Sequence, residues 1–489
     1  MHQHVSILLV VIPLLAAPLA AMTTGRRIPW IVALLATATA LGLAAWQAWL
    51  VMESGPISYA LGGWTPPWGI EYRIDALNAF VALLVAGIGF LSVLYAYTSI
   101  SSEIETRKTP LFYTAFLLCM TGLLGITQTG DVFNVFVFLE ISSLSAYALI
   151  SLGRDRRSLT AAFTYLIMGT IGATFLLIGI GLVYAMTGTL NMADILLRIP
   201  EVAESRTIHT AFAFIVIGIC LKLALFPLHL WLPNAYTYAP SVVTVFLAST
   251  ATKVAVYTLV RFMHSVFGYQ FSFENIPTSW LLVPLATIGL LSTSMVAIGQ
   301  RDVKRMLAYS SVAQIGYMVL GIGMATGTGL VAAILHVFNH GLMKGALFMA
   351  LGAVAYRMGS TSIESMRGLG RQMPLTMAAF VVGGLSLIGV PLTVGFISKW
   401  YLILAAVDLG WWPVVAAIVI GSLLAVIYIW RVVEAAYFQD ANGEPVREAP
   451  LSLLAPTWIL IITNIWFGID TRLTVGMAER AVQLLTGAN

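Results

Sequence analysis

The sequence predicts an all-α integral membrane protein of about fourteen transmembrane helices. Apolar residues make up 59% of the 489 positions, and only 9% are Asp, Glu, Lys or Arg. A soluble domain carries nearer a quarter charged residues, so this chain has too few charges to cover a water-soluble globule. Apolar runs long enough to cross a hydrocarbon core of about 30 Å recur along the whole chain.

The predicted spans follow one another with short polar loops between them. They cover residues 4–22, 28–52, 76–100, 111–128, 131–150, 160–187, 208–226, 241–264, 280–299, 304–323, 326–356, 374–403, 411–437 and 451–470. The first run precedes Arg26 and Arg27 and has no Lys or Arg ahead of it, the reverse of a signal peptide, so it is predicted to be a membrane helix. Residues 60–70, rich in Trp and Pro, are expected to form an interfacial loop.

The Lys and Arg residues are divided unevenly between the two sides of this topology. With the N-terminus outside, fifteen fall on the cytoplasmic side and six on the outer side. The cytoplasmic set is Arg26, Arg27, Arg107, Lys108, Arg154, Arg156, Arg157, Arg301, Lys304, Arg305, Arg357, Arg367, Arg371, Arg431 and Arg447. The outer set is Arg73, Arg198, Arg206, Arg261, Arg472 and Arg480. Because cytoplasmic loops are enriched in basic residues, both termini are predicted to lie outside.

Two predicted spans, the seventh and the twelfth, contain helix breaks. Pro227 and Pro233 follow Lys222, and Pro391 precedes Lys399. Proline interrupts a helix, and irregular backbone at membrane depth is tolerated only where it lines protein or a watery cavity. Broken spans of opposite orientation predict an inverted repeat of spans 4–8 and 9–13. The alternative is that Gly and Pro are simply common in membrane helices.

This repeat divides the chain into four predicted parts. They are an N-terminal three-helix segment (1–110), a first five-helix repeat (111–265), an inverted second repeat (280–437), and a C-terminal helix and tail (451–489). The longest polar stretch is a short loop near residue 440, so no soluble domain is expected.

Seven ionisable side chains lie inside predicted spans: Glu140, Lys222, Lys253, His336, His340, Lys344 and Lys399. A charged residue at a helix centre opposes insertion by about 2.5–3.5 kcal/mol. These side chains must therefore face the bundle interior, pair with one another or meet water. A structural bond to a carbonyl or carboxylate is the alternative for any single buried Lys. For Lys344 the structural and functional interpretations remain equally open.

The residue types and their spacing favour proton transfer. Burial favours the neutral form of an amine, whereas an approaching carboxylate favours the charged form, so a buried Lys can gain and release a proton. Glu140 is the only carboxylate predicted at mid-depth and would be that partner; Asp131, at the outer start of the same helix, is expected to be an end cap. His336, His340 and Lys344 recur every four residues on one helix face, in steps of about 6 Å that need water or hydroxyl groups between them.

These motifs resemble a known family. The string Gly130–Glu140 (GDVFNVFVFLE) resembles the fifth helix of the antiporter-like subunits of complex I and of Mrp cation/proton antiporters. The strings Cys220–Pro233, Ala239–Lys253, His336–Lys344 and Pro391–Lys399 are similar to the family's seventh, eighth, eleventh and twelfth helices. The residue run Phe-Asn-Val-Phe-Val-Phe before Glu140, together with the length of the chain, is most similar to the D subunit of Mrp antiporters.

The resemblance implies a role for each buried charge. Glu140 and Lys222 would form a charge pair, Lys253 a central relay, His336 and His340 its continuation, and Lys399 the exit. The partners implied are the bilayer, other membrane subunits of a hetero-oligomeric complex, protons, and sodium as the exchanged cation. The location implied is a bacterial or archaeal cell (inner) membrane. Sodium passage through this chain has less support than proton passage, because Glu140 stands alone at depth.

Three functions are compatible with the sequence. The first is a proton-translocating subunit of a multisubunit sodium/proton antiporter, and the second is the same module in complex I or a membrane-bound hydrogenase. The third is a membrane enzyme or quinone-binding scaffold with incidental buried charges. Cys119 and Cys220 lie inside spans and form no metal-ligand set, so no cofactor, metal or catalytic residue is predicted. The net charge of +4 does not indicate nucleic-acid binding.

Overall fold

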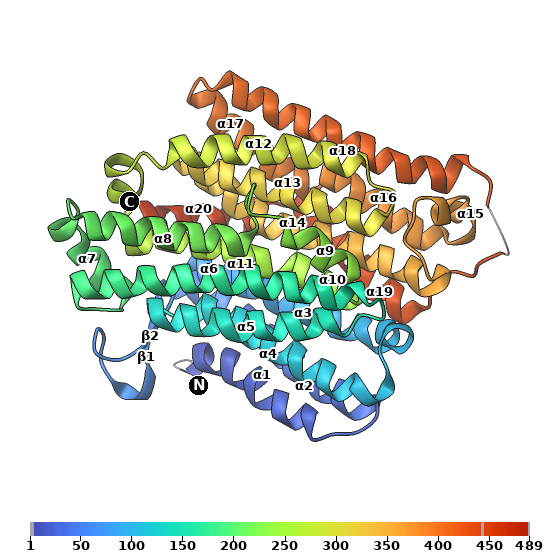
Figure 1. The fold of residues 1–489 in the computed structure, drawn as a ribbon, viewed down its shortest axis with the longest axis horizontal. Helices are drawn as coiled ribbons and strands as arrows, with labels where there is room; N and C mark the ends of the chain where they lie inside the picture. Colours follow the sequence, from blue (N-terminus) through green and yellow to red (C-terminus); the bar gives the residue numbers. More distant parts are fainter. Residues whose placement is uncertain (1–3, 442–444, 488–489) are drawn as a thin grey trace.

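Long apolar helices lie side by side along one direction of the molecule (Figure 1). The computed structural model describes residues 4–441 and 445–487, so the ends of the predicted first and last parts lie outside the described residues. Twelve of the described helices are long and apolar enough to cross a membrane, or thirteen if one bent pair forms a single span. The all-α membrane fold is therefore confirmed, whereas the count of about fourteen remains a prediction.

The N-terminal half contains eleven helices and one hairpin. They are α1 (Val5–Ala21), α2 (Arg27–Ser54), β1 (Ile57–Ala60), β2 (Glu71–Ile74), α3 (Ala76–Glu103), α4 (Thr109–Gln128), α5 (Val132–Ser151), α6 (Arg157–Thr187), α7 (Met192–Val202), α8 (Arg206–Leu223), α9 (Trp231–Tyr238), α10 (Ser241–Ser249) and α11 (Ala251–Arg261). The strands β1 and β2 are antiparallel, with Ile57 opposite Ile74, so the predicted interfacial loop is the connection of a hairpin.

The C-terminal half contains nine further α-helices. They are α12 (Ser279–Ile298), α13 (Val303–Gly323), α14 (Gly327–Met358), α15 (Leu369–Gln372), α16 (Pro374–Ile388), α17 (Val394–Asp408), α18 (Trp412–Phe438), α19 (Leu451–Ile469) and α20 (Arg472–Thr486). The helix α14 lies in the middle of the molecule, and all residues of its most apolar stretch are buried.

Both predicted helix breaks are present. The helix α8 ends at Leu223, and Ala224 adopts a left-handed backbone with φ of 62°. The predicted twelfth span consists of α16 and α17, and Gly389 between them has φ of 95°. A third break, which was not predicted, lies at Thr250 between α10 and α11, inside the predicted span 241–264. The span itself is present as Ser241–Val266. Next to the break the Lys253 ammonium bonds the carbonyl of Ala248.

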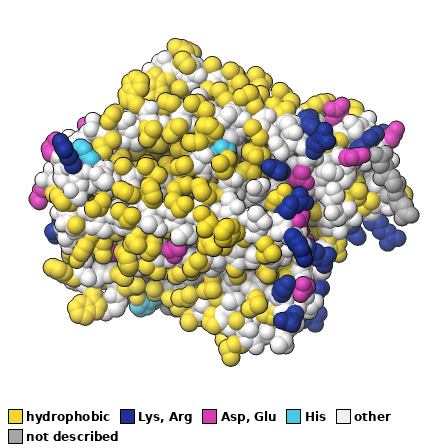
Figure 2. All heavy atoms as spheres, viewed as in Figure 1, with side chains coloured by type: hydrophobic (Ala, Val, Ile, Leu, Met, Phe, Trp, Pro, Cys, Tyr) yellow, Lys and Arg dark blue, Asp and Glu magenta, His cyan; other side chains and the backbone are white. Residues whose placement is uncertain are grey.

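Two amphipathic helices, α7 and α20, lie at the end of the molecule where the chain termini are found (Figure 1). The α20 residue Arg480 donates to the Met52 carbonyl at 2.5 Å, so α20 is fixed against the end of α2. We call this the terminal end. Lys and Arg side chains gather at the opposite end on the face shown in Figure 2, beside α15. We call it the basic end. Which of the two ends faces the cytoplasm remains a prediction.

Candidate functional site

The side chains of Lys222 and Glu140 meet inside the first half of the chain. The Lys222 Nζ lies 3.4 Å from Glu140 Oε1 and donates to Ser143 Oγ at 2.9 Å. Glycines at 172 and 218 let α6 and α8 approach closely, because a Cβ at Gly218 would lie 2.6 Å from the Gly172 carbonyl oxygen. From the last turn of α8 the Lys222 side chain reaches Glu140 and Ser143 on α5. The Lys222 side chain is 6% exposed and that of Glu140 is 26% exposed, so only Glu140 reaches the surface of the chain.

A cavity of about 30 Å³ lies beside this pair. Its lining includes Lys222, Ser143 and Tyr165, and also Ala251, which lies two residues before Lys253, but most of the lining is apolar. The volume is sufficient for about one water molecule. Of the charge pair only Lys222 lines this cavity, and Lys253 does not line it.

The central lysine, Lys253, is completely buried. Its Nζ donates to the Ala248 carbonyl and lies 3.3 Å from Thr252 Oγ1. No carboxylate is among these contacts, so backbone and hydroxyl oxygens hold the amine. Lys253 is also close enough to His340 and Lys344 to interact with them electrostatically.

The predicted row on α14 is present and buried. The imidazole of His336 is held at both nitrogens, with Nδ1 2.8 Å from Ser398 Oγ and Nε2 2.9 Å from Gln314 Oε1. The rings of His336 and His340 stack with centroids 5.9 Å apart. Within the described residues, neither nitrogen of His340 has a hydrogen-bond partner. Because a buried polar group normally has a partner, His340 is suited to exchange a proton with water.

The ammonium of Lys344 faces α13. Its Nζ donates to the Leu307 carbonyl at 2.8 Å and to Ser310 Oγ at 2.7 Å, both on α13. These contacts fit the structural interpretation of Lys344, and its place one turn beyond His340 fits the functional one. Both interpretations therefore remain open.

The last lysine, Lys399, uses the break between α16 and α17. Its Nζ donates to the carbonyls of Leu387 and Ile388 at 2.9 and 2.8 Å and to Ser422 Oγ at 3.1 Å. The last carbonyls of a helix have no partner within the helix, so the end of α16 provides acceptors for the ammonium. A cavity of about 230 Å³ beside Lys399 opens between α17 and α18.

Several partners of the row were not predicted from the sequence. They are the hydroxyl and amide side chains of Ser143, Ser310, Gln314, Ser398 and Ser422. Polar uncharged residues in otherwise apolar spans were the available signal, but many membrane helices contain them. In the described part of the chain no group of three or more His, Cys, Asp or Glu could hold a metal ion.

The predicted cap is present at the terminal end of α5. Asp131 accepts from the Asn134 backbone N–H at 2.7 Å and so caps the helix. Burial raises the pKa of the Asp131 carboxyl, although hydrogen bonds from the backbone oppose this effect.

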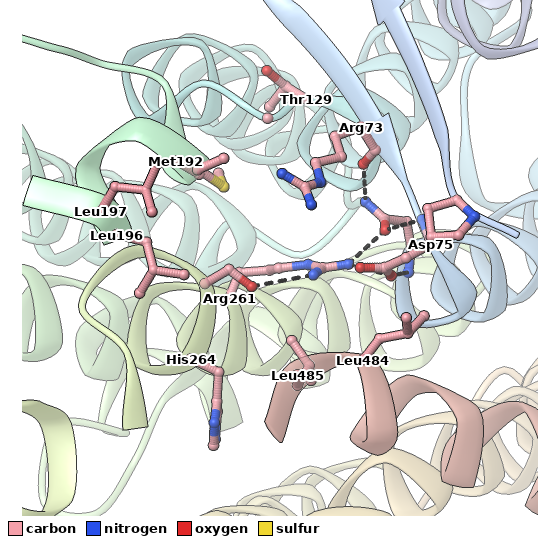
Figure 3. A pocket seen from close by; sticks show the side chains of 15 residues that line it. Arg73, Asp75, Thr129, Met192, Leu196, Leu197, Arg261, His264, Leu484 and Leu485 are labelled. Atoms are coloured by element: carbon pink, nitrogen blue, oxygen red, sulfur yellow. Dashed lines mark hydrogen bonds and ion pairs between the residues drawn. The ribbon is translucent and has the colours of Figure 1, made fainter. Parts of the chain in front are cut away.

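A second polar cluster lies beside a cavity of about 380 Å³ at the terminal end (Figure 3). The Arg261 guanidinium bonds both Asp75 and Asn78 at 2.5 Å, and its Nε donates to Tyr257 at 3.2 Å. Arg261 was assigned to the outer side from the sequence, and it lies at that end, but buried in the last turn of α11. Its burial could not be predicted, because Asp75 is nearly two hundred residues away in the sequence.

Comparisons with known proteins identify relatives over nearly the whole chain. The family model described as "NADH:quinone oxidoreductase/Mrp antiporter, TM" matches residues 129–425, which include the whole buried row. NADH-quinone oxidoreductase subunit N of Desulforudis audaxviator is 43% identical over 96% of each chain. The D subunit of the Na(+)/H(+) antiporter of Alkalihalophilus pseudofirmus is 32% identical over 73% of this chain and 71% of the relative.

A solved structure supports the same relationship. A chain of the membrane-bound sulfane sulfur reductase, an archaeal respiratory membrane complex, is 31% identical and superposes with a TM-score of 0.91. The match covers 99% of this chain and 98% of that chain. The fold is therefore shared from end to end.

Proposed function

Because the chain belongs to the NADH:quinone oxidoreductase/Mrp antiporter family of membrane subunits, we propose that it moves protons through buried Glu, Lys and His side chains. One observation supports this most strongly. Three helix breaks each lie beside a buried lysine, Lys222, Lys253 or Lys399, and buried imidazole groups on α14 belong to the same interior. Structural stability alone does not need such a row, since buried ion pairs rarely improve on apolar residues.

In the proposed mechanism, Glu140 controls the charge on Lys222. While the carboxylate lies 3.4 Å from Lys222 Nζ, it stabilises the ammonium. When Glu140 moves away or takes up a proton, Lys222 releases its own proton toward Lys253. The proton then reaches His340 and His336 through water, and His336 bonds Ser398, the residue before Lys399 on α17.

The parent complex has two candidates. The sequence motifs suggested a sodium/proton antiporter of the Mrp type, with this chain as its D subunit. The 43% identity to a complex I subunit N, compared with 32% to an antiporter D subunit, favours a redox-driven parent. In either case the chain is a transport subunit, and the redox centres of a complex I-like parent would lie on other polypeptides.

The exposure of Glu140 supports a neighbouring membrane subunit. Its α5 face also carries the exposed side chains of Phe133, Val137 and Leu144. A carboxylate at membrane depth is unfavourable against lipid, so we propose that another subunit covers this face. Both termini would lie outside the cell membrane, and 111–265 and 280–437 would form the two inverted repeats.

Substitutions of the charge pair test the proposal. Lys222→Ala and Glu140→Gln should lower proton transport by the native complex at least about tenfold, because positioned acid–base groups contribute that much or more. Lys108→Ala, which removes an exposed ion pair at the basic end, should leave transport unchanged. Transport would be measured in proteoliposomes after checking that the complex assembles. Normal rates in both charge-pair variants would reject the proposal.

The composition of the purified complex distinguishes the two parents. Iron–sulfur subunits and transport driven by an electron donor would indicate a redox complex. Their absence, with proton movement driven by a sodium gradient, would indicate an antiporter.

A further inference from the structure

A fourth cavity, of about 340 Å³, lies at the basic end of the molecule. It is lined by the last residue of α3, the loop before α6, the start of α10, the first turn of α13 and the end of α14. It contains two groups for which the sequence predicted no functional role, Glu103 and Lys304. Lys304 was assigned to the cytoplasmic side, at the start of the predicted span 304–323; it lies in the first turn of α13 and is only 8% exposed, a burial that was not predicted.

The carboxylate of Glu103 is fixed in this cavity by α10. It accepts from the Ser241 backbone N–H at 2.8 Å and from Ser241 Oγ at 2.6 Å. It is also close enough to the Lys304 ammonium to attract it electrostatically. The Nζ of Lys304 donates to the Ala239 carbonyl at 2.5 Å, in the chain that leads into α10. A buried amine and a carboxylate thus share one cavity wall.

The first turn of α13 connects this cavity with the buried row. Lys304 begins the turn, and three residues later the Leu307 carbonyl accepts from Lys344. Three residues correspond to a rise of about 4.5 Å. Lys304 therefore belongs to the stretch of α13 that Lys344 contacts: Lys304 lines the cavity, and Lys344 bonds Leu307 from the bundle interior.

The cavity at the terminal end is less suited to proton entry. The Arg261–Asp75 pair lines it (Figure 3), and Arg261 carries a fixed positive charge that opposes passage of a proton. The Lys253 ammonium also faces Ala248, on the side of its helix toward the basic end. Access from the basic end is therefore favoured.

We infer that the cavity at the basic end is the site where protons enter or leave the buried row, with Glu103 and Lys304 as its proton-exchanging groups. The inference deepens the proposed function and rests on it. When Lys304 has passed its own proton inward and is neutral, a proton from solvent binds the Glu103 carboxylate and passes to the Lys304 amine, which becomes an ammonium again. From there it crosses by water and Ser310 to Lys344 and His340. Each group returns to its starting form, and the reverse order releases a proton at the same side.

Neutralisation of the carboxylate provides the first test. Glu103→Gln should lower transport by the native complex in membrane vesicles at least about tenfold. Glu105→Gln is the matched control, since this carboxylate lies two residues away, is largely exposed and does not line the cavity. Lys222→Ala is measured in parallel.

Blocking the cavity provides a test that does not depend on replacing a charged residue. In a background with Cys119 and Cys220 replaced by Ser, Ser360→Cys places a thiol in the cavity wall. A membrane-impermeant, positively charged methanethiosulfonate should label it only from the basic side and abolish transport. The exposed Thr106→Cys at the same end should be labelled without loss of transport.

The outcomes separate the inference from the proposed function. If Lys222→Ala retains full transport, the proposed function fails. If Lys222→Ala is inactive while Glu103→Gln and fully labelled Ser360→Cys transport normally, only the inference is overturned. Loss of transport in all three, with both controls active, supports it.

Discussion

The ion pair between Arg261 and Asp75 provides the sharpest prediction for stability. Their side chains are only 8% and 14% exposed. The guanidinium also bonds Asn78, Tyr257 and Ser265, so nearly all of its donors are used. Removal of Arg261 would leave a buried carboxylate without its counter-charge, which destabilises a protein far more than loss of a surface pair.

The expected magnitude follows from these contacts. Removing one partner of a buried pair costs about 3–5 kcal/mol. Asp75 would keep two backbone donors, Leu77 N–H at 2.9 Å and Asn78 N–H at 3.2 Å. We therefore expect Arg261→Met to cost about 3 kcal/mol, at the lower end of that range. The double variant Arg261→Met/Asp75→Leu removes both charges and should recover part of the loss.

The assay is the midpoint of thermal unfolding of the detergent-solubilised complex. The matched control is Arg198→Met, whose pair with Asp194 is 46% and 20% exposed and is expected to contribute at most about 1 kcal/mol. Arg261→Met should lower the midpoint clearly more than Arg198→Met. Equal shifts in the two variants, or a double variant no better than the single one, would refute the reasoning.

Three further predictions concern single residues. Burial raises the folded-state pKa of the Asp131 carboxyl, so just above pH 3.8 the folded protein binds a proton that the unfolded chain has already released, and the wild type loses stability as the pH rises. Asp131→Asn has no carboxyl to titrate. Its unfolding midpoint, relative to that of the wild type, should therefore increase between pH 4 and 6. Gly395→Ala places a Cβ 1.8 Å from a carbonyl oxygen of α16 and should lower both the unfolding midpoint and transport, whereas Gly181→Ala meets no atom within 4 Å and should change neither. Gln314→Leu removes the partner of His336 Nε2 and should reduce transport in proteoliposomes about tenfold or more, with little change in the unfolding midpoint; an unchanged rate would exclude this imidazole from the pathway.

Much of the fold could be predicted because the bilayer imposes a strong length and composition rule on each span. The breaks near Pro227 and Pro391 were also predictable, since proline acts locally on its own helix. The helix α7 was missed because its 11 residues are too short and too polar to give a membrane signal. The break at Thr250 was missed because no proline or glycine marks it; what accompanies it is a side chain–backbone bond formed by Lys253.

The buried row was predictable, but its surroundings were not. An isolated charge inside an apolar run is visible in the sequence, and so are histidines at four-residue spacing. A charge near a predicted helix end gives the same pattern whether it is solvated or buried. From the sequence, Lys304 and Arg261 could therefore only be assigned to a side of the membrane. Their buried ammonium and guanidinium groups bond residues distant in the sequence, Ala239 for Lys304 and Asp75 for Arg261.

The broken helices explain how several amines can be buried with a single carboxylate at depth. Lys399 bonds the last two carbonyls of α16, and Lys253 bonds the carbonyl of Ala248 next to the break at Thr250. Free carbonyls at a helix C-terminus carry partial negative charge, which stabilises an ammonium. These acceptors are neutral and fixed, so they can hold an amine in either protonation state without retaining the proton as a full carboxylate would. Glu140, by contrast, can change its own charge, and this difference is the physical reason to place the control of transport at Glu140 rather than at any of the lysines.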